Sequence, residues 1–77
     1  MPPPRIPPIH CLLGFEALAR LRSVTLAADE LNVTPSAVSH RMRQLESQLG
    51  VRLFGRGDFT LSADGATYLV QVRQGLQ

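Results

Sequence analysis

Apolar residues recur at helical spacing along most of the chain, which predicts helices separated by short polar turns. The first helix begins near Pro8 or Ile9 and ends at residues 20–22, whose two arginines complement the helix dipole. Gly14 lies inside it and indicates either a close contact with another helix or simple tolerance. The expected buried stripe comprises Ile9, Leu12, Phe15, Leu18 and Ala19.

A second helix follows at once. Ser23 or Thr25 caps its N-terminus, because a hydroxyl oxygen can accept a hydrogen bond from an amide of the first turn. Asn32 ends it, since asparagine tolerates a left-handed backbone better than most residues. The side chains expected to face the core are Ala27, Ala28, Leu31 and, in the turn, Val33.

The third helix has the clearest boundaries. Thr34 caps it, Pro35 occupies its first position, and Gly50 ends it as a left-handed terminator. Small polar and basic side chains occupy the side opposite the apolar stripe, which comprises Val38, Met42, Leu45 and Leu49. Two helices joined by such a tight turn predict a helix-turn-helix that offers this polar side to a DNA groove.

The pattern changes after Gly50. Apolar residues that favour strands flank the turn-forming residues 55–58, so a short two-stranded hairpin is expected over 51–61. Ser62 then caps a fourth helix, with Asp64 in its first turn. One face of this helix carries Leu69, Val72 and Leu76.

Composition and charge narrow the functional classes. A chain of 77 residues forms one small domain, and all eight of its basic residues are arginines. Between Thr34 and Phe54 lie Arg41, Arg43 and Arg52 against the single acid Glu46, which is expected to pair with an arginine. This basic segment indicates either an anionic partner or a solvated arginine-rich face.

Other classes of function find no support in the sequence. The single cysteine, Cys11, is interpreted as a buried thiol, and neither a metal site nor a cofactor is expected. Ser39 and His40 are adjacent on a helix, so their side chains diverge and cannot form a catalytic pair; no enzyme is predicted. The proline-rich arm of residues 1–8 lacks a signal-peptide core, and no run approaches the ~20 apolar residues of a membrane span. An intracellular protein is expected. The arm is either a flexible leader or a ligand for a proline-binding domain.

An ordered series of motifs resembles the N-terminal DNA-binding domain of LysR-type bacterial transcriptional regulators. The Pro7-Pro8-Ile9 entry and Ala37-Val38-Ser39-His40 are most similar to the branch typified by the glycine-cleavage activator. The matching motifs are Leu12-x-x-Phe15, Ser23-x-Thr25-x-Ala27-Ala28-x-x-Leu31-x-Val33-Thr34, Ala37-Val38-Ser39, Leu45-Glu46, Leu49-Gly50, Leu53-Phe54, Arg56 and Leu61-Ser62-x-x-Gly65.

The resemblance implies a mainly α, winged helix-turn-helix fold: a three-helix core, a short β-hairpin wing and the start of a linker helix. It divides the chain into the arm 1–8, the DNA-binding domain 9–61 and the beginning of a linker helix, 62–77. The effector-binding domain of the family is absent from these residues, so a small-molecule effector is expected only if such a domain exists. Double-stranded operator DNA in the bacterial cytoplasm is the implied partner, bound by a homodimer or tetramer.

The candidate DNA-binding residues gather on and around the third helix, whose recognition segment is 35–49. They are Thr25, Thr34, Pro35, Ser36, Ser39, His40, Arg43 and Arg56. Each candidate has an alternative role that does not involve DNA. Helix capping alone also explains the two threonines. The serines could bond to their own helix backbone, and Arg56 could be a solvated turn residue. The resemblance assigns dimerisation to Leu69, Val72 and Leu76, which could instead pack on the chain's own core.

Two departures from the family pattern affect recognition. Pro35 and Ser36 stand where the family usually has glutamine and proline. The wing is shorter by about two residues, lacks the family's second arginine and has Asp58 nearby. A less basic wing grips phosphates less well. The alternative function is a winged-helix protein adaptor that does not bind DNA.

Overall fold

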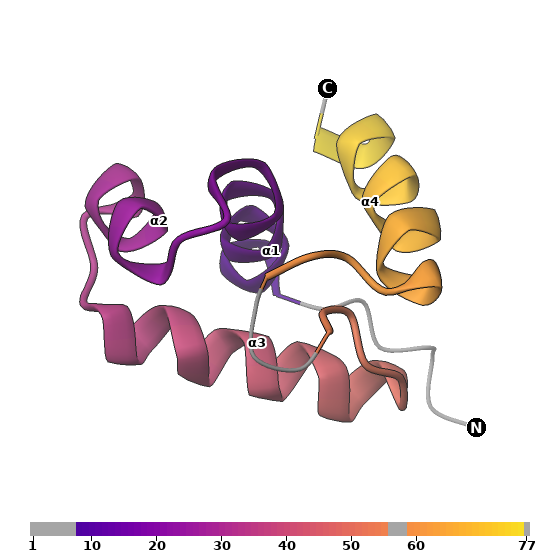
Figure 1. Ribbon diagram of the computed structural model, residues 1–77. Helices are drawn as coiled ribbons and strands as arrows, with labels where there is room; N and C mark the ends of the chain where they lie inside the picture. The colour runs from indigo at the N-terminus through magenta and orange to yellow at the C-terminus, as the bar shows by residue number, and fades with distance from the viewer. Residues whose placement is uncertain (1–7, 56–58, 77) are drawn as a thin grey trace.

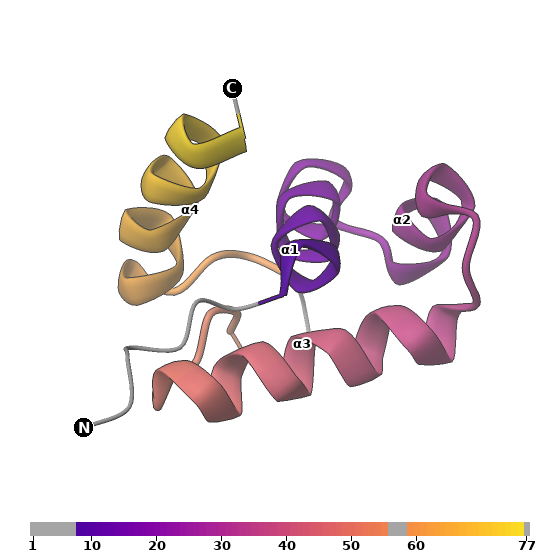
Figure 2. The same cartoon turned by 180° about the vertical axis from the view of Figure 1, so that it is seen from behind.

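The computed structural model describes residues 8–55 and 59–76, which contain all four expected helices. They are α1 (Ile9–Leu21), α2 (Val24–Leu31), α3 (Pro35–Leu49) and α4 (Ala63–Leu76). In Figures 1 and 2, α3 runs along one side of the molecule, and α1, α2 and α4 all lie on the same side of it. α1 lies between α2 and α4 and contacts the other three helices.

Local capping chemistry sets the helix boundaries. The Ser23 hydroxyl accepts a hydrogen bond from the Leu26 amide at 3.2 Å, so Ser23 and not Thr25 caps α2. The Thr34 hydroxyl likewise accepts from the Ala37 amide at 3.1 Å at the start of α3. Asn32 (φ 58°) ends α2 in the left-handed conformation, as predicted.

The core is centred on Phe15, whose side chain is fully buried. Its ring lies 5.6 Å from the ring of Phe54 and 5.7 Å from that of Tyr68, measured between centroids. These contacts join α1 to the segment after α3 and to α4. The core side chains are Cys11, Phe15, Ala17, Leu18, Ala27, Ala28, Val38, Met42, Leu45, Leu53, Phe54, Leu69 and Val72.

The predicted buried stripe of α1 is partly wrong. Ile9 is 58% exposed, whereas Cys11 and Gly14 are buried beside Phe15 and Leu18. Small residues lie inward because α1 approaches α3 closely: a Cβ on Gly14 would lie only 3.2 Å from the methyl carbon of Met42. Of the two interpretations of Gly14, the close helix contact is therefore confirmed.

The segment after α3 contains less β-structure than expected. Its described residues form one antiparallel bridge, between Phe54 and Leu61, and no strand. The amide of Gly55 donates to the carbonyl of Thr60 at 2.8 Å. The predicted two-stranded hairpin is thus not confirmed, and its turn, residues 56–58, lies outside the described residues.

Packing of α4 corrects the expectation for its apolar face. Leu69 and Val72 are 8% and 5% exposed and belong to the core, so both pack on the chain's own core as the alternative interpretation held. The side chain of Leu76 lies outside the described residues. Val70, on another side of α4, is 58% exposed.

Within residues 8–55 and 59–76, none of the helices has both the length and the apolar character needed to cross a membrane.

Candidate nucleic-acid interface

The side of α3 that faces away from the other helices carries most of the candidate binding residues. Pro35, Ser36, His40 and Arg43 are exposed and Ser39 is half-buried, while Val38, Met42 and Leu45 face inward. Because the other three helices lie on one side of α3 in both views, its opposite side is uncovered (Figures 1 and 2). An uncovered helix with a polar side has the shape that fits a DNA major groove.

The turn before α3 fixes the direction of this helix. The Val33 amide donates to the Ala28 carbonyl at 3.0 Å, and the Asn32 amide donates to the Asp29 carbonyl at 3.3 Å. Both bonds close the end of α2 onto the turn. The buried alanines Ala27 and Ala28 then let α2 pack closely, so that the first turn of α3 is held at a defined angle.

The two candidate threonines differ in their roles. The Thr34 side-chain oxygen accepts the capping bond, which leaves its hydroxyl proton for an outside acceptor. Thr25 lies within the first turn of α2 and is exposed, and it is not the cap of that helix. Capping therefore accounts for Thr34 but no longer for Thr25.

The ion pairs of the described residues involve side chains of α1, α2 and α4 but none of α3. Arg20 forms ion pairs with Glu16 and Glu30, and Arg73 lies 3.8 Å from Glu16, so these charges on α1, α2 and α4 compensate one another. Hydrogen bonds with Glu30 and Glu16 raise the pKa of Arg20 further. Across the described part of the chain, no ion pair involves Arg41, Arg43 or Arg52. Arg22, between α1 and α2, is exposed and likewise in no ion pair among the described residues, so three of the four described arginines without an ion pair lie on or after α3.

Arg41 differs from Arg43 in its position on α3. It is half-buried, and its Cδ lies 3.9 Å from where a Cβ on Gly14 would be. Burial raises the pKa of the nearby Cys11 thiol, and the charge of Arg41 offsets part of that effect. The prediction of a buried thiol is confirmed, and Arg41 packs against α1 while Arg43 stays exposed.

Glu46 is structural, as expected, but through a different partner. Its carboxylate accepts a hydrogen bond from the Leu53 amide at 2.7 Å, and no described arginine pairs with it. This bond ties the end of α3 to the segment that follows. The sequence contained no signal for a backbone partner seven residues away.

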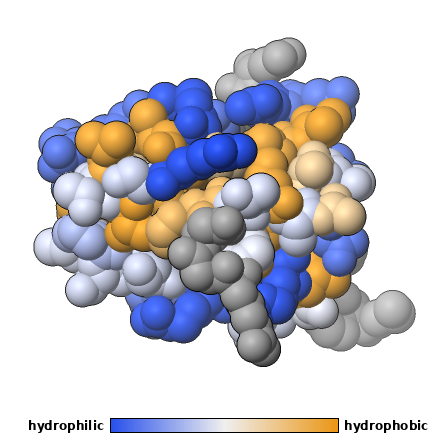
Figure 3. All heavy atoms as spheres, viewed as in Figure 1, coloured by the Kyte–Doolittle hydropathy of each residue, from blue (hydrophilic) through white to orange (hydrophobic). Residues whose placement is uncertain are grey.

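The surface over the first half of α3 is mostly polar, as expected for a helix side that faces solvent (Figure 3). In Figure 3 the surface over the first half of α3, at lower left, is pale to blue with little orange, as weakly polar side chains require. Arg56, the remaining candidate, lies outside the described residues. Those residues also contain no cluster of three or more histidine, cysteine or acidic side chains able to hold a metal ion.

Comparisons with known proteins agree on one family. The family model described as "Bacterial regulatory helix-turn-helix protein, lysR family" matches residues 10–66. The glycine cleavage system transcriptional activator of Escherichia coli (strain K12) is 42% identical over 72 residues, which cover 91% of this chain and 24% of that protein. The chain therefore spans about a quarter of the length of this curated relative.

Two solved structures of similar fold contain DNA. The CbnR_DBD–DNA complex matches with a TM-score of 0.83 and 31% identity over 90% of this chain and 82% of that one. The BenM_DBD/benA site 1 DNA complex matches with a TM-score of 0.86 and 27% identity, over 90% of this chain and 80% of that one.

Proposed function

Because the chain belongs to the LysR family of bacterial helix-turn-helix regulators, we propose that it binds operator DNA sequence-specifically in the bacterial cytoplasm and regulates transcription. The uncovered polar side of α3 is the observation that carries this proposal. In the proposed complex, α3 lies in the major groove of double-stranded DNA. A gel shift on random duplex at low salt, with elution from heparin, tests it. A protein adaptor would show neither retention nor salt-dependent binding.

Direct contact with bases falls mainly to three side chains at the beginning and middle of α3. Ser36 and Ser39 can donate to or accept from any base, and His40 can bond to guanine. Pro35 offers only apolar contact, which suits a thymine methyl group. Their grouping on the exposed side of α3 supports this assignment.

Phosphate contacts would surround this reading surface. Thr25 and Thr34 lie at the N-termini of α2 and α3, where a hydroxyl and the helix dipole both favour an anion. Arg43 lies further along α3, within reach of the backbone, and Arg56 would contact phosphate or the minor groove from the wing. Residues 9–61 would then form the DNA-binding domain, with 1–8 as an arm and 62–77 as the start of a linker helix.

Replacing Arg43 with alanine should weaken binding to all DNA sequences by a similar factor, because a phosphate contact carries no sequence information. The slope of log affinity against log salt should flatten by about one contact. Fluorescence anisotropy on operator and random duplexes over a salt series would measure both. A loss confined to the operator would contradict the phosphate role.

Replacing His40 with alanine should instead relax the preference at particular base pairs. A base contact discriminates by about 1–3 kcal/mol, so operator affinity should fall by about 5- to 150-fold while affinity for random DNA changes little. Binding-site selection with both proteins would locate the affected positions. Equal losses on operator and random DNA would rule out base reading by His40.

Pairing of two copies through α4 is also part of the proposal, since one such domain reads only a half-site. Leu69 and Val72 are already used in the core, so within the described part of α4 the exposed Val70 is the large apolar side chain left for a partner helix. Val70→Glu should therefore leave the thermal melt unchanged and reduce self-association in sedimentation equilibrium. Unchanged association would contradict this face.

A further inference from the structure

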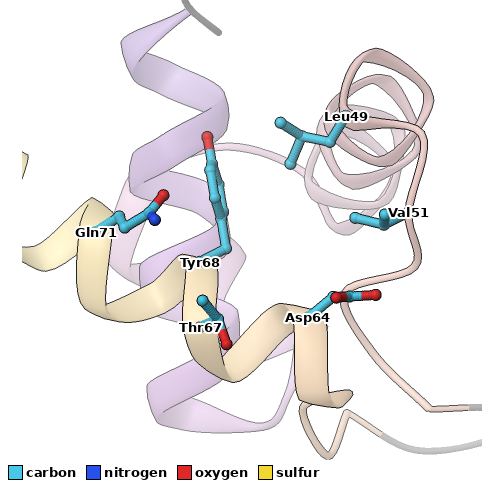
Figure 4. Close-up of a pocket in the computed structure, with 6 residues that line it drawn as sticks. All are labelled: Leu49, Val51, Asp64, Thr67, Tyr68 and Gln71. Carbon is cyan, nitrogen blue, oxygen red and sulfur yellow. The ribbon is translucent and has the colours of Figure 1, made fainter.

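A shallow pocket lies between the end of α3 and the first half of α4, away from the uncovered side of α3. Its apolar wall is formed by Leu49, Val51 and the ring of Tyr68, and its polar lining by Asp64, Thr67 and Gln71. Figure 4 shows Tyr68 and Gln71 projecting from α4 on one side, with Leu49 and Val51 opposite them. Nothing in the proposed DNA contacts uses this pocket.

The lining has the chemistry that binds proline-rich peptides. An aromatic ring and aliphatic side chains accept proline rings, while hydroxyl and amide donors bind the free carbonyls of a polyproline II backbone. Burial raises the pKa of the Tyr68 phenol, so it stays protonated and can donate. The side-chain amide of Gln71 is a second donor on the same rim.

We propose that this pocket binds residues 1–7 of the chain's own proline-rich arm. The arm, which ends at Pro8, holds five of the six prolines of the chain. Pro8, the first described residue, is exposed and has φ −57° and ψ 143°, which is polyproline II geometry. In Figure 4 the Tyr68 hydroxyl points toward the N-terminal end of α1, the end that Pro8 joins.

Reach and charge agree with this occupant. A polyproline II segment of seven residues would span about 22 Å, enough to cross the pocket. Arg5 is the only charged side chain of the arm, and Asp64 is the only charged side chain of the lining. Arg5 lies about 9 Å along the arm from Pro8, and Asp64 about 6 Å along α4 from Tyr68. If the Pro8 end of the arm lies beside Tyr68 and the arm runs toward the N-terminus of α4, Arg5 would lie close to Asp64.

The tether makes a weak contact sufficient. Covalent attachment at Pro8 gives the arm an effective concentration on the order of 1 mM, so an arm with a Kd of about 1 mM would occupy the pocket about half the time. Docking would fasten the start of α1 to α4 and hold the angle between α4 and the recognition helix. This inference does not depend on DNA binding, and its test uses no DNA.

Tyr68 provides a specific probe, because the chain has one tyrosine and no tryptophan. A variant that lacks residues 2–7 should keep its helical circular dichroism but change its Tyr68 fluorescence and the NMR shift of the Gln71 side-chain amide. Adding a peptide of residues 1–8 should restore both signals with a Kd near or below about 1 mM. The intact chain should respond more weakly than the truncated variant, because its own arm competes with the peptide for the pocket.

A matched peptide with Arg5→Glu should bind at least about tenfold more weakly, because it faces Asp64 with like charge. Should the deletion lose helix content, the full-length chain carrying Arg5→Glu provides the same comparison at the Gln71 amide. Unchanged Tyr68 and Gln71 signals on arm removal, with no saturable response to the peptide, would overturn the proposal. Signals in the intact chain that vary with protein concentration would assign the pocket to a second copy and overturn it too.

Discussion

Replacing Gly65 with alanine is expected to destabilise the domain by about 3 kcal/mol or more, the upper range of overpacking costs. A Cβ at this position would lie 2.1 Å from the carbonyl oxygen of Leu53, far inside van der Waals contact. A domain of this size loses about 4–8 °C of Tm for each kcal/mol, so thermal melts should fall by more than about 12 °C.

Leu53 cannot move aside, because its buried side chain and two backbone hydrogen bonds fix its position. Its side chain is fully buried, its amide donates to Glu46 at 2.7 Å, and its carbonyl accepts from the Ser62 amide at 2.9 Å. The Ser62 hydroxyl also caps α4 by accepting from the Gly65 amide at 2.9 Å. A methyl group on Gly65 must therefore break either the cap of α4 or the anchor of the segment after α3.

Gly75→Ala is the matched control. No atom lies within 4 Å of a Cβ built there, so alanine should be neutral or stabilise α4 by up to about 1 kcal/mol. Gly14→Ala should fall between the two, because the group in its way is the flexible end of Met42. Melting temperatures in the order Gly65→Ala, Gly14→Ala, Gly75→Ala, lowest first, are expected. Equal values for the first and last would contradict the close approach.

The helix boundaries could be predicted from the sequence because capping is local chemistry. Thr34, Asn32 and Gly50 each act through the backbone of their own turn, and the structure confirms all three. Which side of α1 faces the core could not be predicted as reliably as the helix ends. A buried stripe of helical period can begin at either Ile9 or Cys11. The choice depends on how closely α3 approaches Gly14, which is a tertiary contact.

The candidate site shows the same division. The outward position of Ser36, His40 and Arg43 followed from the helical period once Val38 and Met42 faced inward. The fate of Leu69 and Val72 did not follow, because a core-facing stripe and a dimer-facing stripe have the same spacing. Only the packing of α4 against Phe15 and its neighbours distinguishes them.

Ser36→Glu should abolish most DNA binding without weakening the fold. Ser36 is exposed in the first turn of α3, where an acidic side chain stabilises the helix dipole by about 0.3–1 kcal/mol. In the proposed complex the same carboxylate faces DNA phosphates and base-edge acceptors. Such like-charge contacts cost several kcal/mol, so affinity should fall at least about 100-fold while Tm stays level or rises.

Gln74→Glu is the matched control for Ser36→Glu, because it makes the same change in net charge without altering the proposed groove contact. Both variants lower the net charge from +2 by one unit, but Gln74 is exposed near the C-terminal end of α4, and that end of the helix points away from α3 (Figures 1 and 2). Charges beyond a Debye length of about 10 Å at 0.1 M salt are largely screened, so this variant should lose only about twofold in affinity. Anisotropy titrations and melts of both variants measure the two quantities. Because stability and affinity should move in opposite directions only for Ser36→Glu, parallel losses in both variants would exclude α3 as the groove-binding helix.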